Sequence, residues 1–136
     1  MKSKLTFVLI SFIAFAICIS SCKKGTDNTS RQMVQADDSE NGKTINVSAG
    51  QSLKLTLGNP GDGGYAFDNP LYNSAVLSLT NHTHIAPTSG AIGDFGKDAW
   101  EFKALKSGST TLSVTATRSF DKAPPVVIFS GNVAVN

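Results

Sequence analysis

Alternation of apolar and polar residues with a period of two is the feature that most limits the folds open to this chain. Segment 51–57 places Leu53, Leu55 and Leu57 on one face of an extended backbone. Comparable runs recur downstream: Ile45 and Val47; Ala75, Leu77 and Leu79; Trp100, Phe102 and Ala104; Leu112, Val114 and Ala116; Val127, Phe129, Val133 and Val135. Side chains of a strand alternate between its two faces, so each run predicts a strand with one buried face. No stretch shows the helical period for more than a turn or two.

Turn-forming residues separate these runs about every ten residues. They occupy segments 48–50, 59–65, 106–108 and 123–125. Short strands at this spacing predict an all-β fold, an immunoglobulin-like antiparallel β-sandwich of about seven to eight strands, over residues 43–136. The sequence lacks the Cys…Trp…Cys framework of an antibody-type domain.

The N-terminal segment predicts export and lipidation. A basic start is followed by an apolar run over residues 5–19, which is typical of a secretory signal and short for a membrane anchor. Ser20 and Ser21 lead into Cys22, as in a bacterial lipobox, so residues 1–21 are predicted to be a lipoprotein signal peptide with Cys22 lipidated. The alternative is an ordinary cleavage site with a chance cysteine, which would leave Cys22 as a lone exported thiol.

Residues 22–42 are polar, mixed in charge and without period. Such a segment buries too little to offset the entropy of ordering, so it is predicted to be a flexible tether with a reach of roughly 25 Å. These features place the protein in the bacterial cell envelope, attached to a membrane through its lipid anchor only. Lys23, in place of the aspartate that retains some lipoproteins in the inner membrane, favours the outer membrane. Whether it faces the periplasm or the cell surface is left open.

Charge and residue types argue against several function classes. Without Lys2 and Lys4, ten of the twelve basic residues remain against ten acidic ones, which gives no electrostatic footprint for nucleic acid. The mature chain has no usable thiol, no nucleophile elbow and no evident Ser–His–Asp set, so an enzyme and a cofactor are not expected. His82 and His84 share a strand face, but no third ligand lies close by in sequence, so no metal site is expected.

Three loops are the candidate functional segments, because binding residues concentrate on loops carried by rigid sheets. In the first loop, Pro60 fixes its own φ and the glycines permit conformations closed to other residues. Segment 85–97 is long for a hairpin connection, and the third loop exposes an aromatic residue beside a guanidinium. The candidate residues are Asn59, Pro60, Gly61, Asp62, Gly63, Gly64 and Tyr65; Gly93, Asp94, Phe95 and Gly96; and Arg118, Ser119 and Phe120.

In this order the three loops resemble those of the chagasin-type (chagasin and amoebiasin-like) inhibitors of papain-family cysteine proteases. The family's loops read Asn-Pro-x-x-Gly-Tyr, Gly-x-Gly-Gly and Arg-Pro-Trp, and segment 100–112 is similar to the family's central strand, turn and strand. The resemblance covers residues 43–136. This chain departs from the pattern in three ways: its first loop has one extra residue, Phe95 stands at a usual glycine, and Ser119 and Phe120 replace proline and tryptophan.

The resemblance implies a monomeric, tight, reversible, non-covalent inhibitor, whose first loop enters the protease cleft while the other two flank it. Phe95 and Phe120 are then the expected flanking anchors, since flat aromatic rings bind at little rotamer cost. Tyr65 is expected to pack at the base of its loop. Arg118 is expected to bond loop carbonyls or a carboxylate on the enzyme, and Asp62 to approach the enzyme's imidazolium.

Hydrogen bonds from Asn59 or Asp62 to loop amides are expected to pre-order the first loop, because freezing its glycines on binding would otherwise cost affinity. The competing interpretation is a lipid-anchored immunoglobulin-like adhesion or carbohydrate-binding module. That module would explain the sandwich, the anchor and the exposed aromatic residues equally well.

Overall fold

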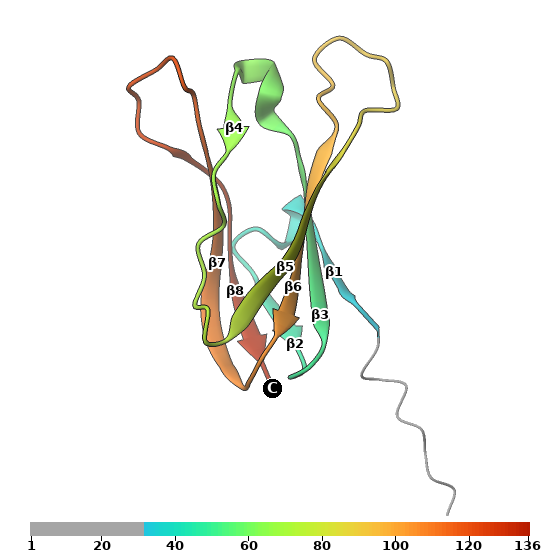
Figure 1. Ribbon diagram of the computed structural model, residues 1–136, viewed down its shortest axis with the longest axis vertical. Coiled ribbons are helices and arrows are strands. Elements are labelled where there is room, and N and C mark those ends of the chain that lie inside the picture. The colour runs from blue at the N-terminus through green and yellow to red at the C-terminus, as the bar shows by residue number, and fades with distance from the viewer. Residues whose placement is uncertain (1–31) are drawn as a thin grey trace, which may run out of the picture.

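The computed structural model describes residues 32–136 and confirms the predicted all-β sandwich (Figure 1). Its elements are β1 (Val34–Ala36), η2 (Asp38–Glu40), β2 (Thr44–Val47), β3 (Ser52–Gly58), η3 (Pro60–Gly63), β4 (Ala66–Phe67), β5 (Leu77–Ile85), β6 (Lys97–Ala104), β7 (Gly108–Thr117) and β8 (Val126–Val135). One four-stranded sheet has the order β1-β3-β6-β5 and the other β2-β8-β7-β4. The pairs β1–β3 and β2–β8 are parallel, and the others are antiparallel.

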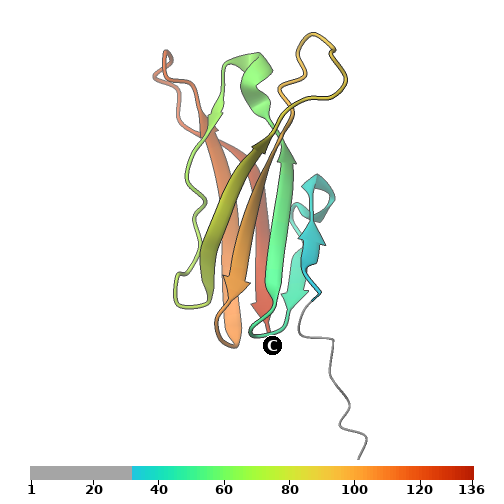
Figure 2. The ribbon, with the colours of Figure 1, turned by 45° about the vertical axis from the view of Figure 1, so that its right-hand side comes forward.

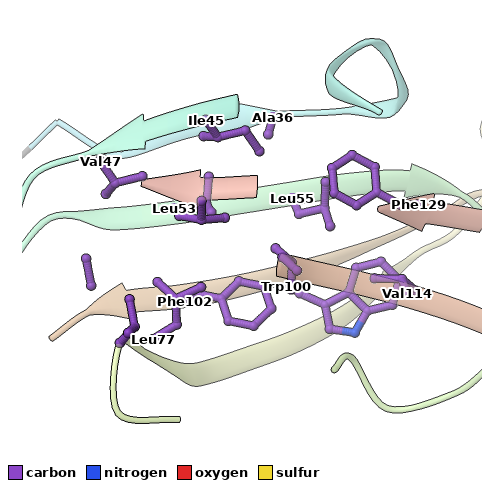
Figure 3. Packing of buried hydrophobic residues seen from close by; sticks show 14 of the residues in the cluster. Ala36, Ile45, Val47, Leu53, Leu55, Leu77, Trp100, Phe102, Val114 and Phe129 are labelled. Atoms are coloured by element: carbon purple, nitrogen blue, oxygen red, sulfur yellow. The ribbon is translucent and has the colours of Figure 1, made fainter. Parts of the chain in front are cut away.

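The core lies between the two sheets and is formed by the predicted alternations (Figure 3). Leu53, Leu55 and Leu57 are fully buried, while the residues between them on β3 are partly exposed. Trp100, buried on β6, meets the edge of the Phe67 ring at a centroid distance of 4.9 Å. The sequence contains no other tryptophan, so Trp100 reports on the packing of the whole core.

Two β-bulges shift the alternation in ways the sequence did not predict. On β8, Phe129 pairs with Val114 and Val127 pairs with Thr115, so Ile128 is the extra residue. A bulge reverses the face of the residues beyond it. Val127 was predicted to share the buried face of Phe129, but it is 60% exposed.

The folded domain begins earlier than residue 43, so the predicted flexible tether is wrong for residues 34–42. Val34–Ala36 forms the edge strand β1 beside β3, and Ala36 is buried in the core. The 3₁₀ turn η2 has a capping box: the Asp37 side chain accepts a hydrogen bond from the backbone of Glu40, and the Glu40 side chain accepts one from the backbone of Asp37. Backbone groups of residues 34–42 thus make hydrogen bonds within the turn and with the sheet. The polar sequence of this segment did not predict them. Cys22, the signal peptide and the remaining tether lie outside the described residues.

The connections β3–β4, β5–β6 and β7–β8 lie at one end of the sandwich, which we call the loop pole (Figures 1 and 2). The turns β2–β3 and β6–β7 lie at the opposite end, together with the C-terminus. Within residues 32–136, no helix is long and apolar enough to cross a membrane. The loop pole therefore gathers all three candidate loops.

Candidate functional site

The first loop, residues 59–65, is an ordered 3₁₀ turn. Asn59 is its N-cap, and its Oδ1 accepts a hydrogen bond from Gly61 N at 2.9 Å. At the other end, Gly64 adopts the left-handed conformation with φ 70°, and its N–H donates to Gly61 O at 2.8 Å. The expected ordering by Asn59 is thus confirmed, whereas Asp62 makes no hydrogen bond within the part of the chain that the structure describes.

The second loop, residues 86–96, is fixed by Asp94. Its carboxylate accepts hydrogen bonds from the Ser89 hydroxyl and, at 2.8 Å, from Gly96 N, and these two donors lower the pKa of Asp94. Gly96 has φ 76°, and a β-carbon there would lie 2.1 Å from Ile85 O, so no other residue fits. Ile92 in this loop is fully exposed; the sequence interpretation had not singled it out.

The second loop is also joined to the first. Asn59 N donates to Gly96 O at 2.9 Å, and a β-carbon on Gly61 would lie only 2.6 Å from Phe95 Cδ1. Likewise, a β-carbon on Gly93 would lie 3.1 Å from an Asp62 carboxylate oxygen. The glycines therefore let the two loops approach more closely than larger residues would allow.

The third loop, residues 118–125, contacts the opposite side of the first. A β-carbon on Gly64 would lie 2.9 Å from the ring of Phe120. Phe120 and Phe95 nevertheless stay 75% and 47% exposed, so each ring rests on a glycine with much of its surface open. Ser119 is exposed between Arg118 and Phe120. The two predicted aromatic anchors thus flank the first loop.

Arg118 packs beneath this arrangement. Its guanidinium carbon lies 4.3 Å from the centroid of the Tyr65 ring and 5.9 Å from that of Phe120, distances at which a cation is attracted to an aromatic ring. Tyr65 is half-buried, in keeping with the expected packing at the base of its loop. The expected bonding of loop carbonyls is not seen for Arg118 Nε, which is buried without a hydrogen-bond partner in the described residues.

A group of polar side chains below the first loop was missed by the sequence interpretation. The buried carboxylate of Asp98 accepts hydrogen bonds from Asn59 Nδ2 at 2.6 Å, from His82 Nε2 at 2.8 Å and from His84 Nδ1 at 3.1 Å. The His82 ring also stacks on Trp100, with the centroids 4.7 Å apart. Burial opposes ionisation, but the hydrogen bonds from Asn59, His84 and His82 outweigh it and lower the pKa of Asp98.

The bulge on β5 explains why the alternation did not reveal this group. Leu79 pairs with Phe102 and Asn81 with Glu101, so Thr80 is the extra residue. Beyond it, His82 pairs with Trp100 and His84 with Asp98, so the even-numbered positions share the sheet face of these two buried residues. Two histidines and a carboxylate could suggest a metal site. Among residues 32–136, however, no group of three or more His, Cys, Asp or Glu side chains is arranged to hold a metal ion.

Comparisons with known proteins agree with this architecture. The family model described as "Chagasin family peptidase inhibitor I42" matches residues 46–133, more than half of the chain. No curated protein shows a significant match. The chain is similar to EhICP2, a cysteine protease inhibitor from Entamoeba histolytica, with a TM-score of 0.63 and 21% identity over 78% of this chain and 97% of that one.

Two further solved structures are similar. For amebosin, the TM-score is 0.56 and the identity 22%, over 77% of this chain and 99% of that one. For PbICP-C, solved in complex with falcipain-2, the TM-score is 0.47 and the identity 18%, over 77% of this chain and 92% of that one. At identities this low, the likeness to EhICP2 and amebosin is one of fold.

Proposed function

The chain belongs to the chagasin family of peptidase inhibitors, and on that premise we propose that its loop pole blocks the catalytic cleft of papain-like cysteine proteases. It is an inhibitor and not an enzyme. The observation that carries the proposed site is the mutual packing of the three loops, in which Phe95 and Phe120 each rest on a glycine of the first loop. Because the loops pack on one another, they form one contact surface rather than three independent ones.

The first loop is the central part of the loop pole and the part that enters the protease cleft. A bound segment escapes cleavage when none of its carbonyl carbons comes within roughly 3 to 3.5 Å of the catalytic thiolate. The capped turn between Asn59 and Gly64 holds its backbone in a 3₁₀ conformation rather than the extended one of a substrate. It therefore fills the cleft without presenting a peptide bond for attack.

Pre-ordering is the source of the proposed tight binding. Each extra glycine that binding must immobilise costs roughly 0.5–1 kcal/mol relative to alanine. Here the turn is already closed by the hydrogen bonds to Asn59 Oδ1 and Gly61 O, so much of this cost is met on folding. The exposed rings of Phe95 and Phe120, with the exposed Ile92 in the same loop as Phe95, supply apolar contact area.

The test is inhibition of papain by the soluble chain, residues 23–136, followed with a fluorogenic peptide substrate. We expect reversible inhibition that is recovered on dilution. Phe95→Ala and Phe120→Ala should each raise the inhibition constant by about tenfold or more, since truncating a buried aromatic anchor costs roughly 2 kcal/mol. Leu71→Ala is the matched control, because Leu71 is also exposed but lies outside the three loops.

The same assay discriminates the alternative, a lipid-anchored adhesion or carbohydrate-binding module. Absence of inhibition at micromolar concentrations, across several papain-like enzymes, would contradict cleft blocking and favour that module. If Phe120→Ala and Leu71→Ala changed the inhibition constant equally, the chain would still be an inhibitor, but the loop pole would not be its contact surface.

The cellular setting of the inhibitor is a second part of the proposal: export to the bacterial cell envelope, with Cys22 lipidated and the outer membrane favoured. The support is the order of a basic start, an apolar run and small residues before Cys22. A monomeric inhibitor domain then reaches its protease from a membrane surface.

A further inference from the structure

We infer that Asp98 is a positioning residue for inhibition: it sets the orientation of the Asn59 side chain, and through it the conformation of the first loop. This inference rests on the proposed function for its consequence at the protease, but the ordering of the loop can be measured without any protease. Asp98 is buried, with only 5% of its surface exposed, so it acts through Asn59 rather than by contacting a protease.

The Asn59 side chain makes two different hydrogen bonds, and both are needed to fix it. Its Oδ1 accepts from Gly61 N at 2.9 Å, and its Nδ2 donates to Asp98 Oδ2 at 2.6 Å. The carbonyl oxygen and the amino group of an amide are interchanged by a half-turn of the side chain. A half-turn would point Nδ2 at the Gly61 N–H, donor against donor. The acceptor at Asp98 therefore selects the orientation that caps the turn.

Asp98 is itself held from the neighbouring strand. His82 Nε2 and His84 Nδ1, both on β5, each approach a different oxygen of its carboxylate. Each nitrogen donates when it carries the proton, as it does in the protonated imidazole and in one neutral tautomer. The described titratable groups that contact Asp98 are these two histidines. Each oxygen of the carboxylate thus has a histidine partner, which limits the orientation of the Asp98 side chain.

The contribution of the Asp98 carboxylate to the stability of the fold depends on pH. The folded-state pKa of Asp98 lies below its unfolded value. Its contribution is therefore fully present above the unfolded value of about 3.9 and is lost as the pH falls through the lower folded value. Loosening of the first loop in the unmodified protein is expected only below that window.

The experiment compares Asp98→Ala with Glu101→Ala in the soluble chain, because alanine at 98 leaves no acceptor for Asn59 Nδ2. Glu101→Ala is the matched control, because Glu101 also lies on β6 and its carboxylate faces Lys54 at 3.7 Å rather than the first loop. We expect Asp98→Ala to speed hydrogen exchange of the Gly61 amide at least tenfold and to raise the inhibition constant for papain about tenfold. Glu101→Ala should change each by less than twofold.

The reciprocal double variant, Asn59→Asp with Asp98→Asn, restores one donor and one acceptor between the two positions. It should return both readouts to within about threefold of the original protein, which a general loss of stability would not do. Asn59→Asp alone keeps an acceptor for Gly61 N but sets two carboxylates face to face. It should loosen the loop as Asp98→Ala does, which provides a second test if Asp98→Ala fails to fold.

Unchanged Gly61 exchange in Asp98→Ala or, if that variant does not fold, in Asn59→Asp would overturn the inference. No rescue by the double variant would also overturn it. If the unmodified protein does not inhibit papain while Gly61 exchange responds as expected, the proposed function fails and the positioning role of Asp98 stands.

Discussion

Position 61 has no side chain because another loop occupies the space. The Phe95 ring lies where a β-carbon on Gly61 would be, at 2.6 Å. The sequence predicted that the glycines of this loop supply conformational freedom, and for Gly64, with φ 70°, that is correct. Gly61 has no positive φ, so its role is to leave room. The exposure of Phe95 could be predicted from its loop, but its partner lies 34 residues earlier and only the fold brings the two together.

We predict that Gly61→Ala weakens inhibition by about tenfold, or about 1.4 kcal/mol, because the added methyl group displaces the Phe95 ring. The inhibition constant and the aromatic chemical shifts of Phe95 measure the two effects. Gly58→Ala is the matched control: Gly58 lies at the end of β3, has no positive φ and would have no atom within 4 Å of an added β-carbon. Equal inhibition by the two variants would mean that the packing of Phe95 on the first loop is irrelevant to binding.

At the scale of elements, β1 and η2 are the part of the fold that the sequence concealed. Alternation identified the long strands because each has a buried and an exposed face. β1 has only three residues, of which Ala36 alone is buried, so no period is visible. Its position is fixed instead by pairing with β3, which is distant in sequence. The residues after η2 are held by β8: Ser130 N donates to Asn41 Oδ1 at 2.9 Å, and Gly42 N donates to Ser130 O at 2.8 Å.

The two bulges were concealed for a related reason. Residues 80–84 are polar on both faces of the strand, so nothing marks the change of face that turns His82 and His84 toward Trp100 and Asp98. The position of a bulge depends on which residues become neighbours across the sheet, and tertiary structure sets those neighbours. The candidate loops could therefore be predicted from the chain, whereas the group that supports them could not.

Removing residues 23–42 tests whether β1 and η2 belong to the domain. We expect the chain 43–136 to lose roughly 2–3 kcal/mol relative to 23–136, since it exposes Ala36's packing site and leaves the edge of β3 unpaired. At about 4–8 °C per kcal/mol for a domain of this size, the melting temperature should fall by roughly 8 °C or more. Thermal unfolding followed through Trp100 fluorescence measures this. Equal melting temperatures would show that the domain begins at residue 43 after all.

At the scale of the whole molecule, the fold separates the loop pole, the proposed inhibitory surface, from the point where the N-terminal segment joins the sandwich. Gln32 O accepts a hydrogen bond from Gln51 Nε2 at 2.6 Å, and Gln51 belongs to the turn β2–β3 at the end opposite the loop pole (Figure 2). Nine residues lie between Cys22 and Gln32, and the ten steps from one to the other span at most about 35 Å when extended. A lipid at Cys22 would therefore hold the domain by the end that the protease does not need.

We predict that the full chain, expressed in a bacterium, is recovered with membranes and inhibits soluble papain there with a constant within about threefold of that of the soluble chain. The reason is that Gln32, where the N-terminal segment joins the domain, lies at the end of the sandwich opposite the loop pole. Cys22→Ser should release the protein from the membrane without changing inhibition. Cys18→Ser is the control, since Cys18 lies within the predicted signal peptide and its loss should leave the protein attached. Membrane-bound protein that inhibits only after release by protease or detergent would contradict this orientation, and release of the unmodified chain would contradict lipidation itself.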